Sequence, residues 1–180
     1  MRQLFAVAFL VLLFGGAVAP AALPQAQASA VPVSKSSSQS AKVTFRRVFQ
    51  GSSPEYIELC IWDNSKSATY EIRQMDEDAG SAPFEVGDAL RSKIFALTAQ
   101  LHNFQGLDLD VHRKIANLGE KTFRWEQGGA SHETKFNYTL NPAAAQLLQI
   151  FEGLARQQEH YELITRRMRY ADTYQHLVII

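Results

Sequence analysis

The sequence predicts a single α+β domain in which an antiparallel sheet of about five strands carries two long helices on one face. Three observations lead to this fold class. Several short segments alternate apolar and polar residues, two longer segments repeat apolar residues every three or four positions, and the turns between the first strands are short. Two neighbouring parallel strands need a connection of about a dozen residues or more, so the short turns favour antiparallel strands. The expected order of elements is therefore β-β-β-α-β-β-α, with a short helix after the last long one.

The whole chain has the composition of an ordinary globular protein, with 46% hydrophobic and 20% charged residues among 180. Its 18 lysines and arginines balance 18 aspartates and glutamates. No overall field attracts nucleic acid, so we expect no nucleic-acid partner. Cys60 is the only cysteine, which excludes an intramolecular disulfide, and the hydrophobic core must hold the fold.

Residues 1–28 have the order of a secretory signal peptide, with one arginine, an apolar run from Leu4 to Val18, and then small residues. The small residues predict cleavage after Ala28 or Ala30. The alternative is an uncleaved membrane anchor, which needs about 20 apolar residues. The run reaches that length only if its glycines and a proline are counted. We therefore expect an exported protein, periplasmic or secreted, with no transmembrane segment after signal cleavage.

Residues 29–41 are rich in serine and contain no aromatic residue, which predicts a disordered linker. Residues 42–180 then form the domain. Its first three segments, 42–49, 55–62 and 68–75, alternate apolar and polar residues and are separated by short polar turns. This pattern predicts three antiparallel strands joined in sequence order.

After a polar loop at residues 76–83, apolar residues recur with helical spacing and predict a helix over residues 88–103. Its apolar stripe consists of Leu90, Ile94, Leu97, Leu101 and Phe104. Residues 107–120 are ambiguous, since their first half alternates apolar residues with acids and their second half suits a helical turn. Of the two, we expect a strand that leads into the next hairpin.

The segment KTFRWEQGGASHETKFNYT, residues 121–139, predicts a β-hairpin with a two-residue turn at Gly128-Gly129. This turn pairs Trp125 with His132 and separates aromatic from charged residues on the two faces. A large ring buried against a helix contributes roughly 1.5 to 3 kcal/mol, so we expect the aromatic face to be core rather than an exposed binding platform. The expected aromatic face consists of Phe123, Trp125, His132, Thr134, Phe136 and Tyr138.

The second long helix begins at an N-cap, Asn141, followed by Pro142 at the first helical position. Apolar residues behind it keep helical spacing to about residue 170. Asp172 is expected to cap a short terminal helix.

Two surfaces are candidates for contact with a partner. Tyr56 and Trp62 lie on the face of strand 55–62 opposite its three aliphatic residues, and helices on one side cannot cover that face. The two rings are therefore expected to form a half-exposed strip of the kind found at interfaces. The second candidate is a basic cluster near the end of the long helix, formed by Arg166, Arg167 and Arg169. Favourable interaction with the helix C-terminus explains this cluster without a ligand, and a lipid-phosphate or cell-wall anion site is the alternative.

Catalytic and metal-binding spacings are missing from the sequence. The five histidines lack zinc spacing, and the acidic loops that begin at Asp76 and Asp108 lack the glutamate of a calcium loop. No nucleotide-binding or serine-hydrolase motif occurs. We therefore expect no catalytic residue, no metal and no cofactor. His132 is a candidate acid or base, with a histidine bonded to a backbone carbonyl as the simpler interpretation, and Cys60 is expected to be an inert buried thiol.

The segments NLGEKTFRWEQGG, KFNYTLNPAAAQLLQIFEGLA and FQGSSPEYIELCIWD resemble those of a family of exported bacterial proteins of unknown function. The likeness extends from about residue 44 to the end of the chain. The resemblance implies an envelope or secreted location and no named activity.

We therefore expect an exported, non-enzymatic binding or protein-interaction protein of the bacterial envelope, whose partner is an unknown protein or envelope component. Two alternatives stay open. One is a periplasmic carrier that holds a small apolar ligand between the helices and the sheet. The other is an envelope enzyme that uses His132.

Overall fold

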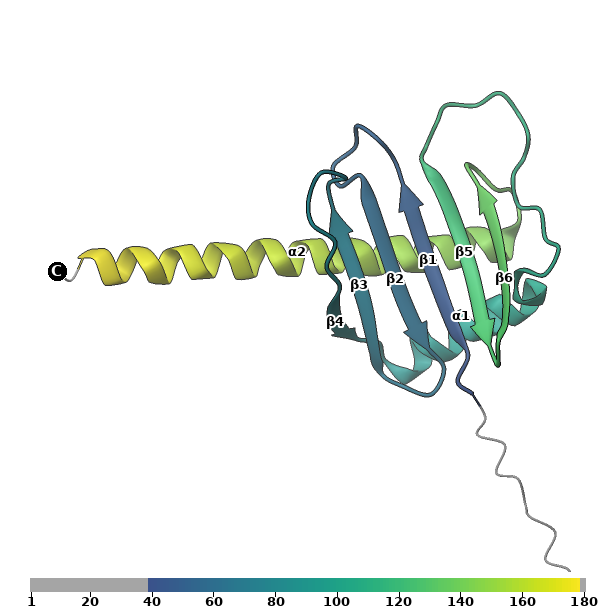
Figure 1. Ribbon diagram of the computed structural model, residues 1–180, viewed down its shortest axis with the longest axis horizontal. Helices are drawn as coiled ribbons and strands as arrows, with labels where there is room; N and C mark the ends of the chain where they lie inside the picture. The colour runs from purple at the N-terminus through teal and green to yellow at the C-terminus, as the bar shows by residue number, and fades with distance from the viewer. Residues whose placement is uncertain (1–38, 179–180) are drawn as a thin grey trace, which may run out of the picture. The chain divides into compact units, whose positions relative to one another are not determined.

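The computed structural model describes residues 39–178, and Figure 1 shows the arrangement of its elements. The strands are β1 (Lys42–Val48), β2 (Tyr56–Trp62), β3 (Ser67–Arg73), β4 (Ala82–Glu85), β5 (Glu120–Gln127) and β6 (Ala130–Phe136). The helical segments are α1 (Asp88–Gln100), the short 3₁₀ turn η1 (His102–Phe104) and α2 (Pro142–Val178). The predicted signal peptide and most of the predicted linker lie outside the described residues. Of the linker, Ala41 is buried, and its carbonyl accepts a hydrogen bond from the Asp63 N–H at 3.0 Å.

The strands form one antiparallel sheet in the order β4-β3-β2-β1-β5-β6, which confirms the predicted α+β class. The prediction of about five strands missed β4, which lies partly in the segment expected to be a polar loop. Its four residues include Pro83 and are too few to show a period of two. Pairing with β3, from Ser67 opposite Glu85 to Tyr70 opposite Ala82, makes this segment a strand.

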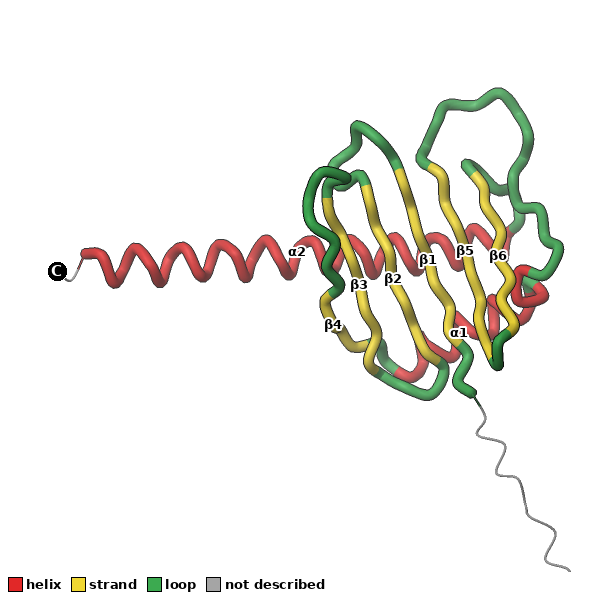
Figure 2. The backbone as a smooth tube through the Cα atoms, in the orientation of Figure 1, coloured by secondary structure: helices red, strands yellow, loops and turns green. Residues whose placement is uncertain are grey.

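Both helices cover the same face of the sheet, as the sequence predicted (Figure 2). Alternate strand residues therefore point into the core. In β2, Ile57, Leu59 and Ile61 are buried, whereas the residues between them are half-buried on the other face. We call this second side of the sheet the open face. The predicted apolar stripe of α1 and η1 also lies in or against the core.

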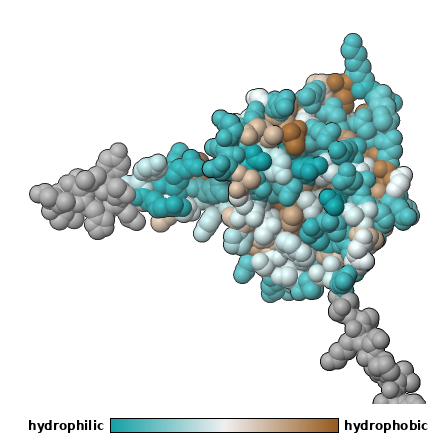
Figure 3. Space-filling view, in the orientation of Figure 1, coloured by the Kyte–Doolittle hydropathy of each residue, from teal (hydrophilic) through white to brown (hydrophobic). Residues whose placement is uncertain are grey.

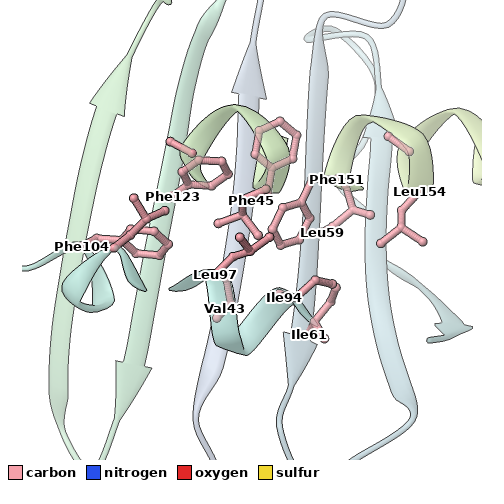
Figure 4. Close-up of a cluster of buried hydrophobic side chains, with 14 of the residues drawn as sticks. Val43, Phe45, Leu59, Ile61, Ile94, Leu97, Phe104, Phe123, Phe151 and Leu154 are labelled. Carbon is pink, nitrogen blue, oxygen red and sulfur yellow. The ribbon is translucent and has the colours of Figure 1, made fainter. Parts of the chain in front are cut away.

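The core is centred on Phe123, whose ring touches four other rings (Figure 4). The ring centroids of Phe45, Phe104, Phe136 and Phe151 lie 5.7, 5.4, 5.3 and 6.0 Å from that of Phe123. These residues come from β1, η1, β6 and α2, so one cluster of rings joins elements far apart in sequence. All five residues are at most 2% exposed.

The β5–β6 hairpin has the register predicted from its two-residue turn, with Trp125 opposite His132 and Gln127 opposite Ala130. Gly128 and Gly129 have φ angles of 60° and 84°, which the turn requires and which glycine adopts without strain. Phe123 and Phe136 both point into the core, so the expected aromatic face is confirmed for these residues. Tyr138 lies beyond the end of β6 and is 44% exposed, so its expected place on the buried face is wrong.

The segment before β5 is a loop, and the strand expected over residues 107–120 is wrong except at its last residue. In this loop a side-chain carboxylate accepts backbone hydrogen bonds from the residues that follow β6. The Asp110 side chain accepts hydrogen bonds from the backbone N–H groups of Asn137 at 2.8 Å and Tyr138 at 3.3 Å. Leu109 is buried and Leu107 packs partly buried against the core, so the alternation in this segment reflects anchored loop residues rather than a strand.

Helix α2 begins as predicted, because the Asn141 side chain accepts hydrogen bonds from the N–H groups of Ala143 and Ala144 at 3.0 and 3.1 Å. The predicted short terminal helix is wrong, since α2 continues without a break to Val178. The sequence contains no glycine or proline after Gly153 that would end the helix. As a result, α2 crosses the sheet and continues beyond its β4 edge (Figure 1).

Candidate functional site

The open face of the sheet is polar, as the mainly hydrophilic colours over the strands show in Figure 3. Ion pairs lie across it, one between β1 and β5 and the others between alternate residues of a single strand. Lys42 lies 2.5 Å and Arg124 lies 3.1 Å from the carboxylate of Glu126, and Arg73 lies 2.6 Å from Glu71. The charged residues therefore neutralise one another in water, and such exposed or half-exposed pairs add little to stability.

Tyr56 and Trp62 both lie half-buried on the open face, at opposite ends of β2. Glu58 and Cys60 separate them, so the two rings do not touch one another. The Tyr56 hydroxyl donates to Glu58 at 2.8 Å, and the Arg73 guanidinium lies 4.6 Å from the Tyr56 ring centroid. Burial and the bond to Glu58 raise the pKa of Tyr56.

The other end of the predicted strip borders a shallow depression of about 540 Å³ beside the hairpin turn. Trp62 lines it together with Gln39 and Arg124. The predicted strip is therefore two separate aromatic positions, one engaged in a polar network and one at the rim of this depression.

Cys60 lies in the middle of the open face, half-buried, with its sulfur 3.5 Å from the Thr44 hydroxyl. Burial raises the pKa of the thiol. Because the thiolate is the reactive form, the thiol is less nucleophilic than an exposed cysteine.

His132 stacks on Trp125, with ring centroids 5.5 Å apart and an angle of 13° between the ring planes. Within residues 39–178 its Nδ1 atom is buried and has no hydrogen-bond partner. A catalytic histidine needs a second group that orients its ring. The described residues provide a stacking partner for His132 rather than such a group.

The distal half of α2 carries the predicted arginine cluster. We call residues 142–158 the proximal half and residues 159–178 the distal half. Side chains are described up to Tyr170, and the large apolar residues of this stretch are unusually exposed. They are Tyr161, Leu163, Ile164, Met168 and Tyr170, with exposures of 65, 48, 56, 65 and 62%.

A groove with a volume of about 770 Å³ lies between the distal half of α2 and the β3–β4 edge of the sheet. We call it the edge groove. Tyr70 of β3 and Ala82 of β4 line its sheet side, and the helix contributes Tyr161, Glu162, Thr165, Arg166, Arg169 and Tyr170. The structure thus brings Arg166 and Arg169 together with three tyrosines. Arg167 does not line this groove.

Tyr70 connects the two walls of the edge groove. It is 7% exposed, and its ring packs edge-on against Phe84 at 5.8 Å between centroids. Burial, together with a hydrogen bond to Glu162, raises the pKa of Tyr70 to about 12. Glu162 is therefore engaged with the groove wall, and the exposed Arg166 brings a positive charge to the opening.

The backbone of β4 is poorly suited to pair with an added strand along this edge. The Val86 N–H donates to the Lys66 carbonyl at 2.9 Å. Because backbone groups alternate in direction along a strand, those of Ala82 and Phe84 also point toward β3, and those of Pro83 and Glu85 point away from the sheet. Pro83 has no N–H to donate. A partner in the edge groove would therefore be recognised by side chains rather than by strand addition.

A buried cation that the sequence analysis missed is Lys121, which is 5% exposed. Its Nζ donates to the carbonyls of Leu118, Gly119 and Asn137 at 3.0, 3.1 and 2.9 Å. Burial is the main cause that lowers the pKa of Lys121. Three carbonyl acceptors match the three donors of an ammonium. Lys121 therefore connects the loop before β5 with the residue that follows β6. The hairpin register was the available signal, because it places Lys121 opposite the buried Phe136.

The acidic loop that was compared with a calcium site contains a histidine–aspartate pair instead. His112 Nε2 lies 2.6 Å from Asp108 Oδ2, and this contact raises the pKa of His112 and lowers that of Asp108. Across residues 39–178 no group of three or more histidine, cysteine or acidic side chains is arranged to hold a metal ion.

No protein-family model matches the chain, and a search of the curated proteins finds no match either. The likeness to exported bacterial proteins therefore stays a prediction. The functional argument rests on the geometry of the surfaces described above.

Proposed function

We propose that the protein is an exported, non-enzymatic interaction protein of the bacterial envelope that binds its partner in the edge groove. The observation that carries this proposal is the convergence of Tyr70, Tyr161, Tyr170, Arg166 and Arg169 on one concave surface. Tyrosine and arginine are the residues most enriched where protein interfaces concentrate their binding energy. Concave shape and this composition together favour a binding site over an ordinary solvated helix face.

The charge of the groove indicates the chemistry of the partner. Arg166 lines it, and the acidic residue among its described lining residues, Glu162, interacts with Tyr70. A partner segment with a carboxylate and an apolar or aromatic side chain complements this surface, because a planar guanidinium binds carboxylates with two parallel hydrogen bonds.

The two alternative functions have less support. A carrier needs an open space among the hairpin rings, and Phe123 instead packs against four neighbouring rings. An enzyme that uses His132 needs an orienting partner for that ring, and its Nδ1 atom has none within residues 39–178. The depression beside Trp62 remains a second possible contact for the same partner.

The envelope location rests on the signal peptide pattern of residues 1–28 and on the family resemblance. In the part of the chain that the structure describes, no helix has both the length and the apolar character needed to cross a membrane.

Site-specific photocrosslinking in cells that express the protein tests the groove. A photoreactive residue at Thr165 is expected to give a discrete adduct that weakens when Arg166→Glu is added. A photoreactive residue at Glu133, which is exposed on the open face, is the matched control and is expected to give none. An adduct of equal strength at both positions, or one indifferent to Arg166→Glu, would contradict the proposal. A residue at Trp62 reports on the second possible contact.

A further inference from the structure

Helix α2 changes its apolar side where it leaves the sheet. The proximal half buries Leu147, Phe151 and Leu154 toward the sheet. The same side of the distal half continues with polar residues, since Gln158 is buried and Glu162 and Thr165 are half-buried. The spacing of these positions, three or four apart, keeps them on one line of the helix.

The apolar residues of the distal half lie on the other side. At about 100° per residue, the five exposed apolar residues from Tyr161 to Tyr170 fall within about half of the helix circumference. This half is centred nearly opposite the line of Gln158, Glu162 and Thr165. We call it the outer half-face. Because it is turned away from the sheet and continues beyond the sheet edge (Figure 1), the rest of the domain does not cover it.

After Glu159 and Glu162, the charges of the helix have one sign as far as Tyr170. Residues 163–170 include three arginines and no acidic residue. Arg167 lies within the outer half-face and Arg166 beside it, and both are exposed. Tyr161 and Tyr170 stand at the two borders of the half-face, where an amphipathic ring can keep its hydroxyl in water.

We propose that the outer half-face of α2 lies on an anionic lipid surface. A helix that binds parallel to a membrane has an apolar side of this kind, basic residues that reach the phosphates, and aromatic residues at the level of the headgroups. A flat, negatively charged surface complements a convex half-face that carries Arg167 and, among residues 160–170, no carboxylate. This proposal rests on residues that do not line the edge groove, namely Leu163, Ile164, Arg167 and Met168. Tyr161 and Tyr170, at the borders of the half-face, also line the groove.

Vesicle flotation tests this proposal. Residues 37–180 form one compact unit that contains every described strand and helix, so this unit is used. It is expected to float with vesicles of equal parts phosphatidylglycerol and phosphatidylcholine, and not with phosphatidylcholine alone. Each basic residue near an anionic surface contributes about fivefold in partitioning, so Arg167→Glu is expected to reduce binding at least fivefold.

A second variant tests the apolar contribution. Leu163→Glu with Ile164→Glu is expected to abolish flotation, because it places two carboxylates on the outer half-face. The matched controls are Leu140→Glu, 62% exposed, and Lys114→Glu in the exposed loop. Both are expected to float like the unaltered unit. Circular dichroism verifies that each variant is folded.

Hydrogen exchange gives an independent readout on the unaltered protein. Backbone amides of residues 159–170 are expected to gain protection when phosphatidylglycerol vesicles are added. Equal flotation with both vesicle types, equal losses in the controls, or unchanged exchange overturns the proposal. So does a protein adduct trapped at Leu163 in cells together with no vesicle binding, since the half-face would then be a protein interface.

Discussion

The proximal and distal halves of α2 share one continuous backbone helix but have opposite surroundings. In the proximal half, Leu147 and Phe151 are fully buried between the helix and the sheet. In the distal half, apolar residues of similar size such as Ile164 and Met168 are more than half exposed. The difference teaches that the helical backbone of a segment and the burial of its side chains have separate causes. The distal half contains no glycine or proline that would interrupt its backbone helix, whereas tertiary packing stabilises the proximal half.

The largest expected effect comes from the proximal half. Replacing Phe151 with alanine removes a ring stacked on Phe45 at 5.3 Å and leaves a cavity in the core. The free energy of unfolding is expected to fall by about 3 to 5 kcal/mol. Urea unfolding followed by circular dichroism measures it. A loss below about 1 kcal/mol would show that the proximal half is not packed as described.

The next largest effect is expected at Lys121, beneath the proximal half. Lys121→Met keeps much of the side-chain volume but leaves three buried or partly buried carbonyls without their donor. We expect a loss of about 1 to 3 kcal/mol. Lys135→Met, on the exposed side of β6, is the matched control and should stay within about 0.5 kcal/mol. Equal effects at the two lysines would contradict the structural role of Lys121.

A smaller effect is expected where the sheet and the distal half meet. Tyr70→Phe removes the hydroxyl that bonds Glu162, and at neutral pH it should cost about 1 kcal/mol. The pKa of Tyr70 is raised from 10.0 to about 12 in the folded state, so the folded protein holds this proton more tightly than the unfolded chain. The contribution is complete below pH 10 and is lost as the pH rises toward 12.

The measurement is the unfolding free energy of both proteins as a function of pH. Unaltered protein should lose stability more steeply than Tyr70→Phe between pH 10 and 12. Parallel curves would mean that Tyr70 titrates alike in both states. Tyr56 titrates in both proteins, so comparing the two removes its contribution.

The smallest effects are expected in the distal half itself. Ile164→Ala and Met168→Ala remove exposed groups, so each should change the free energy of unfolding by less than about 0.5 kcal/mol. The contrast with Phe151→Ala is the sharpest form of the comparison between the two halves. A loss above about 1.5 kcal/mol at either distal position would place that residue in a buried interface, such as one between two copies of the chain.

Much of the fold was predictable because local patterns carried it. The alternation in β1, β2 and β3, the two-glycine turn, and the Asn141-Pro142 start of α2 are each determined by neighbouring residues. The strand β4 was missed because four residues around a proline have no pattern of their own. The loop before β5 was taken for a strand because its alternation has a different cause, the anchoring of Leu109 and the hydrogen bonds of Asp110.

The candidate sites were predictable only as residue types. The cluster of three arginines was evident from the sequence, but Tyr70 lies 96 residues before Arg166, and no spacing rule brings the two together. The expected pairing of Tyr56 with Trp62 on one strip also depended on distance along β2. The two rings share a face, as the alternation required, but Glu58 and Cys60 lie between them on that face.

The sequence alone determined which residues face inward on the paired strands, because side chains alternate with a period of two and burial of one face is worth several kcal/mol. The sequence also contains nothing after Gly153 that interrupts a helix, although Asp172 was taken for the cap of a separate helix and α2 runs through it. Only the tertiary structure decided how far the sheet extends beneath that helix. Sheet width depends on pairing between segments distant in sequence, and it is this width, ending at β4, that leaves the distal half of α2 and the edge groove open to partners.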